Sequence, residues 1–177
     1  MKPATRPDLV LLEFDTWANA RLFDACELLD NTALDREFEM GLGSIRKSLL
    51  HNLGAMIGWT GVLQKVEDPF AGMREENAHS IEEIRATQLS ASKAFHAAVL
   101  TGSFDDTMTR EREEKTVVFT RGGICAHVMT HSMHHRAQCL NMLRHLDAAK
   151  FRGFPILIRR DNRWIWPRNY RSFPFPS

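Results

Sequence analysis

A run of twelve residues that begins at His127 constrains the fold of this chain more than any other feature, because four of the twelve are histidines. His127, His131 and His135 follow one another at intervals of four, inside a stretch whose pattern predicts a helix from about residue 123 to residue 145. Residues four apart on a helix lie one turn above each other on the same face. The three side chains therefore form a ladder along the predicted helix, and His134 points elsewhere.

Two adjacent rungs of this ladder can bind one divalent ion through imidazole nitrogens at about 2.0–2.1 Å. For a single histidine, an ordinary surface or core residue is the better interpretation. Here the ladder lies among apolar residues such as Val128 and Met129, which favours metal binding. Because a metal site needs three or four protein ligands, the third must come from a facing helix. His51, which lies among leucines in a second predicted helix, is the best candidate, with a core histidine as the alternative.

Three earlier segments have apolar residues at intervals of three and four, which is typical of helices packed on a core. Asp8 is the expected N-cap of the first segment, which runs to about residue 30 and is followed by a connecting loop over residues 34–42. Ser44 and Ser80 are the expected N-caps of the second and third. The positions expected to be buried are Leu11, Phe14, Ala18, Leu22, Ala25 and Leu29 in the first, Ile45, Leu49, Met56 and Leu63 in the second, and Ile81, Ile84, Gln88, Ala91, Phe95 and Ala98 in the third.

The segment between the third helix and the histidine run is β-prone. Residues 107–111 can pair with the segment Thr116–Thr120 as a hairpin. The charged residues from 110 to 115 between them are interpreted as a solvated loop. The sequence Arg121-Gly122-Gly123 is expected to form the turn that leads into the last helix.

The last 28 residues differ in character from the rest. Residues 150–177 contain seven Lys or Arg and one Asp, a net charge of +6, so that subtraction from the total of +1 leaves −5 for the first 149 residues. Residues 156–158 and 164–166 flank Asp161-Asn162 and can form a small hairpin. The later prolines exclude regular helix. Seven aromatic residues in this extension predict that it packs on the helices or contacts a dimer partner, and both alternatives are open.

The overall composition excludes several classes of function. A chain of 177 residues is long enough for one domain with a real core. Its net charge of +1 gives no general electrostatic reason to bind nucleic acid. No stretch approaches 18 uncharged apolar residues, so no membrane span is expected. Cys26, Cys125 and Cys139 lack CxxC spacing, and we expect three free thiols, as in a protein of the reducing cytoplasm.

Four stretches together make the chain similar to the DinB-like (DinB/YfiT-like) family. They are Trp17-Ala18-Asn19, Gly43-Ser44-Ile45-Arg46, the spacing from His51 to Trp59, and His127-x3-His131-x3-His135-Arg136-x-Gln138. The last of these is the most specific, and the resemblance covers residues from about 9 to 146. It implies an all-α fold, an up-down-down-up four-helix bundle, in a domain of residues 1–149. Residues 150–177 would then be a separate basic and aromatic extension.

The resemblance also implies a metal site and a class of chemistry. In the family one histidine of the second helix and two of the fourth hold a divalent ion, and here these would be His51, His131 and His135. His127 would lie one turn away as an outer group or an alternate ligand. The family usually has Gly after the Arg, where this chain has Ala137, and this departure removes no ligand. Three neutral histidines with open coordination positions fit zinc or nickel.

The function that the resemblance implies is a metal-dependent hydrolase, or a transferase that uses a low-molecular-weight thiol, acting on a small molecule. The alternative is a non-catalytic, stress-associated metal-binding protein, which the lack of an obvious general base favours. His127 and Arg136 are candidate catalytic helpers, although Arg136 is equally suited to bracing the helices through Glu13 or Asp15. We expect a cytoplasmic homodimer that binds neither nucleic acid nor membranes.

The extension gives the first testable prediction. Burial of one aromatic side chain contributes about 1.5–3 kcal/mol, whereas an exposed ion pair contributes about 0–1 kcal/mol. Deletion after Ala149 should therefore lower the melting temperature or change the oligomeric state, and added salt alone should not reproduce either effect. Thermal denaturation and analytical ultracentrifugation measure the two quantities. A truncated chain that matches the full chain in both would show that the extension is not packed on the protein.

Overall fold

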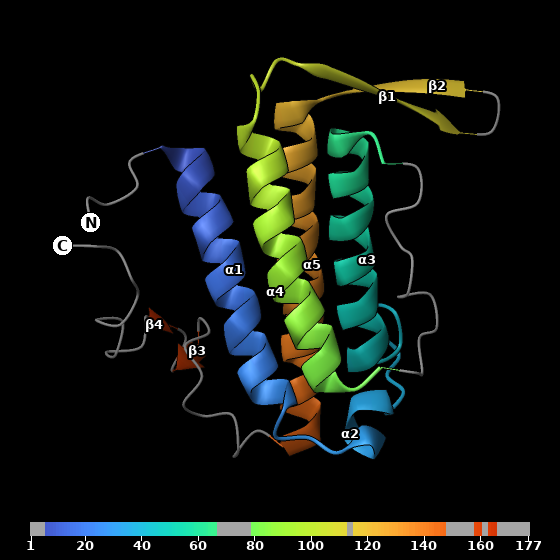
Figure 1. Cartoon of the computed structure of the whole chain (residues 1–177). Coiled ribbons are helices and arrows are strands. Elements are labelled where there is room, and N and C mark those ends of the chain that lie inside the picture. The colour runs from blue at the N-terminus through green and yellow to red at the C-terminus, as the bar shows by residue number, and fades with distance from the viewer. Residues whose placement is uncertain (1–5, 67–78, 113–114, 148–157, 161–162, 166–177) are drawn as a thin grey trace.

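The computed structural model describes residues 6–66, 79–112, 115–147, 158–160 and 163–165. Four long helices account for most of it, together with one short helix and two small hairpins (Figure 1). The elements in chain order are α1 (Pro7–Cys26), α2 (Asn31–Asp35), α3 (Ile45–Gln64), α4 (Ile81–Leu100), β1 (Thr107–Arg112), β2 (Lys115–Thr120), α5 (Arg121–Asp147), β3 (Ile158–Arg160) and β4 (Arg163–Ile165). The predicted all-α fold class is confirmed.

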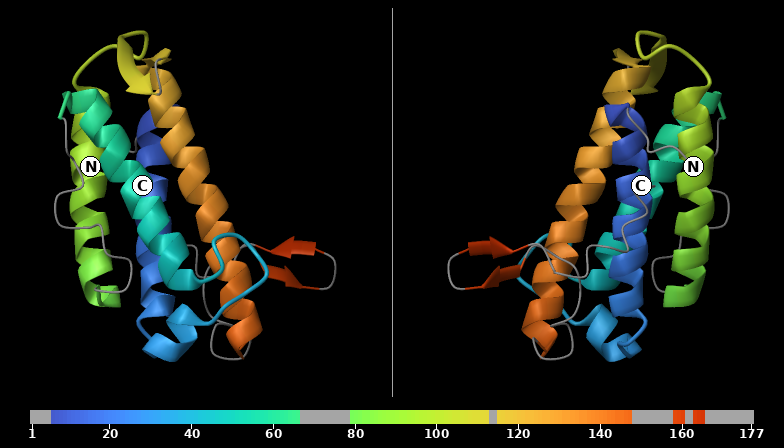
Figure 2. Two further views of the ribbon diagram at one scale, coloured as in Figure 1. Left: turned by 90° about the vertical axis from the view of Figure 1, so that its right-hand side faces the viewer. Right: turned by 90° about the vertical axis from the view of Figure 1, so that its left-hand side faces the viewer.

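The four long helices lie side by side, and α1 and α5 run in one direction while α3 and α4 run in the other (Figure 1). Helix α3 packs against both α4 and α5, and α1 packs against the same two helices. The β1–β2 hairpin lies at the end of the helices where α5 begins, and α2 lies at the opposite end (Figure 2). The core between the helices is formed by fully buried side chains that include Leu12, Ile45, Leu53, Met56, Ile84, Phe95, Ile124 and Met142.

The predicted caps of α3 and α4 are confirmed, and that of α1 is wrong. The Ser44 hydroxyl accepts a hydrogen bond from the Lys47 amide, and Ser80 forms a capping box with Glu83. In α1 the N-cap is Arg6, and Asp8 lies in the first turn. The reason is Pro7, which lacks an amide hydrogen and has the φ angle of a helix, so that it is suited to the first helical position.

Helix α1 is shorter than predicted, and the segment after it is not a simple loop. The helix ends at Cys26, and Asp30 caps the short helix α2 by accepting a hydrogen bond from the Ala33 amide. Residues 31–35 are thus helical, although the sequence predicted a helix end followed by a loop. Asx side chains favour such caps because they satisfy one of the free amides of the next helix turn.

The buried face of α1 also differs from the predicted apolar stripe. Leu11 is half exposed, whereas Asp15 and Asn19 are buried. Asp15 forms an ion pair with Arg136 of α5, and Asn19 donates a hydrogen bond to Asp15 at 2.9 Å. The carboxylate and the guanidinium are thus each other's counter-ion in the core, where an unpaired charge would be costly. Two polar residues therefore occupy core positions that apolar spacing cannot identify.

The hairpin predicted before the last helix is confirmed, and two details near it are corrected. Thr107 to Arg112 pair antiparallel with Thr120 to Lys115, so that Arg110 lies in a strand opposite Val117 and not in a solvated loop. Helix α5 begins at Arg121, and the two glycines that follow belong to its first turn. The Gly123 amide donates to the Thr120 hydroxyl at 3.0 Å, which satisfies one of the free amides at that helix end.

The three cysteines are free, as predicted, and all three are buried. In the extension, β3 pairs antiparallel with β4, which confirms the small hairpin there. The Asp161-Asn162 turn and the predicted packing of the aromatic residues fall outside the described residues. The division into a domain of residues 1–149 and an extension of residues 150–177 therefore stays a prediction.

The buried Asp15–Arg136 pair gives the second prediction. Asp15→Ala leaves the Arg136 charge buried without its partner, so it should reduce the free energy of unfolding by about 3–5 kcal/mol. Asp24→Ala, on the same helix, is the matched control. Asp24 pairs with Arg85 at a partly exposed position, where such a pair contributes about 0–1 kcal/mol. Urea denaturation measures both, and equal losses in the two variants would contradict the assignment of Asp15 as the essential partner.

Candidate metal centre

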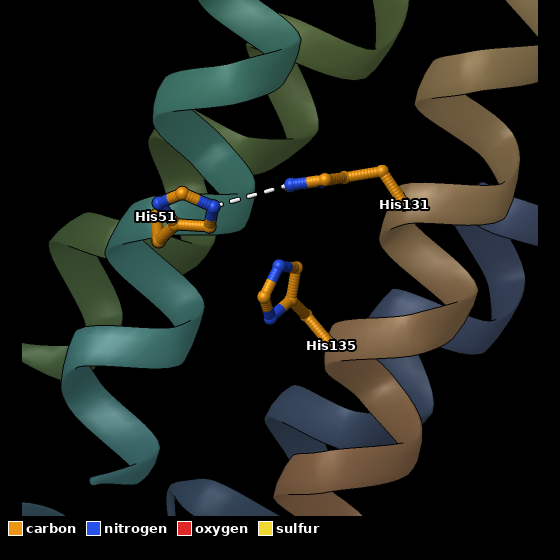
Figure 3. A group of neighbouring side chains, drawn as sticks. All are labelled: His51, His131 and His135. Atoms are coloured by element: carbon orange, nitrogen blue, oxygen red, sulfur yellow. Dashed lines mark hydrogen bonds between the residues drawn. The ribbon is translucent and has the colours of Figure 1, made fainter. Parts of the chain in front are cut away.

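Three histidines from two helices converge between α3 and α5. His51 projects from α3 towards His131 and His135 of α5 (Figure 3). One ligand atom from each lies within 4.8 Å of those of the other two. The Nε2 atoms of His51 and His131 are 3.2 Å apart, and the ring centroids of His131 and His135 are 4.4 Å apart. The structure thus brings together the three residues that the sequence predicted as metal ligands.

The spacing of these nitrogens fits one small divalent ion. Two imidazole nitrogens bound tetrahedrally at about 2.0–2.1 Å lie about 3.3 Å from each other. The measured separation of 3.2 Å between His51 and His131 is close to this value. An ion held by three imidazoles also has open coordination positions. Three protein ligands with an open position are typical of catalytic zinc sites. The residues present could therefore hold a divalent metal.

Gln138 orients one of the three imidazoles. Its amide oxygen lies 2.9 Å from Nδ1 of His135, which fits an Nδ1–H donor and leaves Nε2 with a free lone pair. The amide nitrogen of Gln138 is directed at Nε2 of His134, at 2.9 Å. Gly41, in the left-handed region at φ +56°, packs against Gln138, and a Cβ at Gly41 would approach its amide oxygen to 2.7 Å. Such outer partners fix the tautomer and the orientation of a histidine ligand.

The environment favours the neutral form of His131 and His135. Burial, together with the nearby imidazoles of His135 and His51, lowers the pKa of His131 to about 4. Burial also lowers the pKa of His135, although the Gln138 hydrogen bond acts in the opposite sense. Since metals bind the neutral imidazole, both side chains are in their ligand form at pH 7. The Nδ1 atom of His131 is buried and has no hydrogen-bond partner among the described residues.

His127 does not belong to the convergent group. Its ring centroid is 5.7 Å from that of His131, and it stacks edge-on against Trp59 of α3 at 5.2 Å. Its side chain is exposed and lines a cavity beside the three histidines. Of the two roles that the resemblance implied for His127, the outer group therefore fits this placement better than the alternate ligand.

Arg136 faces away from the three histidines and into the core. It donates to Ser132 at 2.6 Å and to Asn19 at 3.3 Å, in addition to its ion pair with Asp15. This placement confirms the predicted brace through Asp15. It also removes Arg136 from the candidate catalytic helpers, because its guanidinium is occupied on the far side of α5.

Comparison with protein families identifies the family of this chain. The family model described as the DinB family matches residues 1–150. The chain belongs to the DinB family. A search of curated proteins gave no significant match. No helix in the described part of the chain has the length and apolar character that crossing a membrane requires.

Three features of this DinB family member were not identified from the sequence. The bond from Gln138 to His135 could have been suspected, since residues three apart on a helix are neighbours. The contact of Gln138 with Gly41 joins residues that are far apart in the chain, and no local signal predicts it. Arg110, which the sequence placed in a solvated loop, lines the cavity beside His51.

Metal binding by the three histidines gives the third prediction. Replacement of His51, His131 or His135 with Ala should reduce the bound metal strongly, because two imidazoles form only a weak site. Equilibrium dialysis against Zn²⁺ or Ni²⁺, followed by elemental analysis, measures the occupancy. His145→Ala, at an exposed position of the same helix, should retain the wild-type occupancy. If the triple variant still binds one equivalent, these histidines are not the ligands.

Proposed function

We propose that this DinB family member is a divalent-metal-dependent enzyme that acts on a small molecule, as a transferase that uses a low-molecular-weight thiol or as a hydrolase. In this proposal His51, His131 and His135 hold the ion, with zinc or nickel as the best candidates from the all-imidazole donor set. The observation that carries the proposal is a cavity that is lined by His51, one of the three histidines, and provides room for a substrate beside it.

The cavity has a volume of about 650 Å³ and lies between α3, the β1–β2 hairpin and the first half of α5. One face of α3 forms its floor, because His51, Gly54, Ala55, Gly58 and Trp59 are spaced as neighbours along a helix. The small residues of this face leave space directly beside the metal-ligand candidate His51. A volume of this size is in the range of small-molecule sites.

The residues around the cavity favour thiol chemistry over hydrolysis. When bound, a divalent ion supplies Lewis acidity, which lowers the pKa of a water or thiol ligand. No carboxylate of the described residues lines the cavity, and with His51 bound to the ion His127 is the remaining side chain of this lining that can accept a proton. A free thiol has a pKa near 8.5 and ionises far more readily than water, so thiol transfer makes the smaller demand on a general base.

A second candidate function follows from the same lack of a carboxylate. The ion would then mainly tie α3 to α5, and the protein would be a non-catalytic metal-binding protein associated with stress. In that case metal binding should raise the melting temperature without any turnover. Binding to the native state stabilises it by an amount that grows with the ratio of metal concentration to dissociation constant.

An activity assay gives the fourth prediction. Metal-loaded protein should accelerate the reaction of a low-molecular-weight thiol with 1-chloro-2,4-dinitrobenzene, in which a carbon–sulfur bond forms, chloride leaves and the thiol proton passes to His127 or solvent. Chelation of the metal and His135→Ala should each abolish the acceleration, and His145→Ala should preserve it. Parallel assays with 4-nitrophenyl esters test the hydrolase. Inactivity in a broad panel of both, together with metal-dependent stabilisation, would support the non-catalytic alternative instead.

A further inference from the structure

The β1–β2 hairpin presents one face to the helices and the other to solvent. Side chains alternate between the two faces of a strand, and cross-strand partners share a face. Met108 is opposite Phe119 and Arg110 is opposite Val117, so these four residues share one face. Met108 is buried and the other three are half-buried, whereas the alternate residues Thr107, Thr109, Val118 and Thr120 are exposed. The face that carries Arg110 is therefore the inner one.

On this inner face Arg110 is a cation that pairs with no carboxylate of the described residues. The other arginines with buried or half-buried side chains in the described part of the chain are Arg46, Arg85, Arg121 and Arg136, and each of them bonds a carboxylate. Arg110 has no ion pair among the described residues, although it is half-buried and lines the cavity. A partly desolvated guanidinium without an acceptor is suited to bind an anionic group of a ligand.

The other residues that line the cavity indicate the chemical character of the rest of the ligand. The ring of Trp59 lies edge-on to Phe119 at 4.8 Å and edge-on to His127 at 5.2 Å, so that aromatic surfaces surround the space near Arg110. Val117 adds an apolar side chain. Aromatic and apolar walls favour an apolar body of the ligand. Arg110 is the one permanently charged side chain among the described residues that line the cavity, which matches a singly charged carboxylate better than a dianionic phosphate.

We propose that the cavity binds small-molecule carboxylic acids with an aromatic or apolar body, and that Arg110 is the residue that selects for the carboxylate. This inference rests on the proposed function for the role of His51 at the other end of the cavity, where the reacting group of the acid would lie. The planar guanidinium binds the two carboxylate oxygens side by side, and the body of the acid packs on Trp59 and Phe119.

A binding experiment on the metal-free protein gives the fifth prediction. The probes are 3-phenylpropanoate and its neutral amide, 3-phenylpropanamide, which have the same body and differ in charge. Wild-type protein treated with a chelator should bind the acid about tenfold more tightly than the amide, because only the acid forms a charge-assisted pair with Arg110. Titrations followed by the NMR signal of the Trp59 indole N–H, assigned with W59F, measure both affinities.

Two variants make the test specific to Arg110. In Arg110→Gln the affinity for the acid should fall to that of the amide, while the affinity for the amide should stay unchanged. Arg144→Gln removes one positive charge at an exposed position near the far end of α5 and should leave both affinities at the wild-type values. If Arg110→Gln lost the binding of both probes while its melting temperature stayed unchanged, the proposal would be overturned. The residue would then shape the cavity and not select a charge.

The wild-type comparison keeps the inference testable even if Arg110→Gln does not fold. Equal affinities of the wild-type protein for the acid and the amide would overturn the inference without any variant. Because the chelated protein is used, the acid cannot bind through a metal ion. Failure of the proposed metal-dependent activity would not change the ratio of the affinity for the acid to the affinity for the amide. Conversely, an affinity ratio of one would not contradict metal binding by the three histidines.

Discussion

The buried ion pair between Asp15 and Arg136 is the interaction on which the position of the histidines depends. It joins α1 to α5, and Ser132 extends the network by accepting hydrogen bonds from Asn19 and from Asn52 of α3, both at 3.3 Å. A buried charge is costly unless it is paired, so α5 has one favourable rotation and height against α1. Since Arg136 directly follows His135, the rotation that directs the guanidinium into the core directs His131 and His135 towards α3.

This arrangement makes protonation of the three histidines unfavourable, because their positive charges would repel one another. Imidazoles whose ligand atoms lie within 4.8 Å of one another cannot all be protonated without repulsion, and burial together with the neighbouring imidazoles lowers the pKa of His131 to about 4. The repulsion disappears when the side chains are neutral, and neutral imidazoles with free lone pairs are metal ligands. Gln138 selects the tautomer of His135, because it occupies Nδ1 and leaves Nε2 for a ligand. The helices thus hold a set of donors whose favoured protonation state is the one that binds a metal.

Much of this could be predicted from the sequence, and the two failures at functionally placed polar residues share one physical cause. The caps of α3 and α4, the histidine ladder and the position of His51 opposite it depend on spacing along a single helix or on a simple count of ligands. The buried face of α1 was misassigned because Asp15 and Asn19 look like surface residues until Arg136, which is distant in the chain, is placed beside them. Arg110 was misassigned because the side of a hairpin that faces the core depends on its docking, and one step of register reverses every side chain. Local patterns do not contain such long-range pairings.

The cavity combines two elements with separate tasks. Helix α3 provides His51 for the metal centre and continues as the floor of the cavity through Gly58 and Trp59, so the reactive end and the floor are fixed by the same rigid helix. The hairpin adds Phe119 and Arg110 on its inner face, opposite that floor. A two-stranded hairpin is marginally stable alone, and here Met108 and Phe119 attach it to the helices. The apolar pair that anchors the hairpin is the next cross-strand pair to Arg110 and Val117 on the same face, two residues along each strand. The packing that stabilises the hairpin therefore also sets where the guanidinium of Arg110 lies relative to the three histidines.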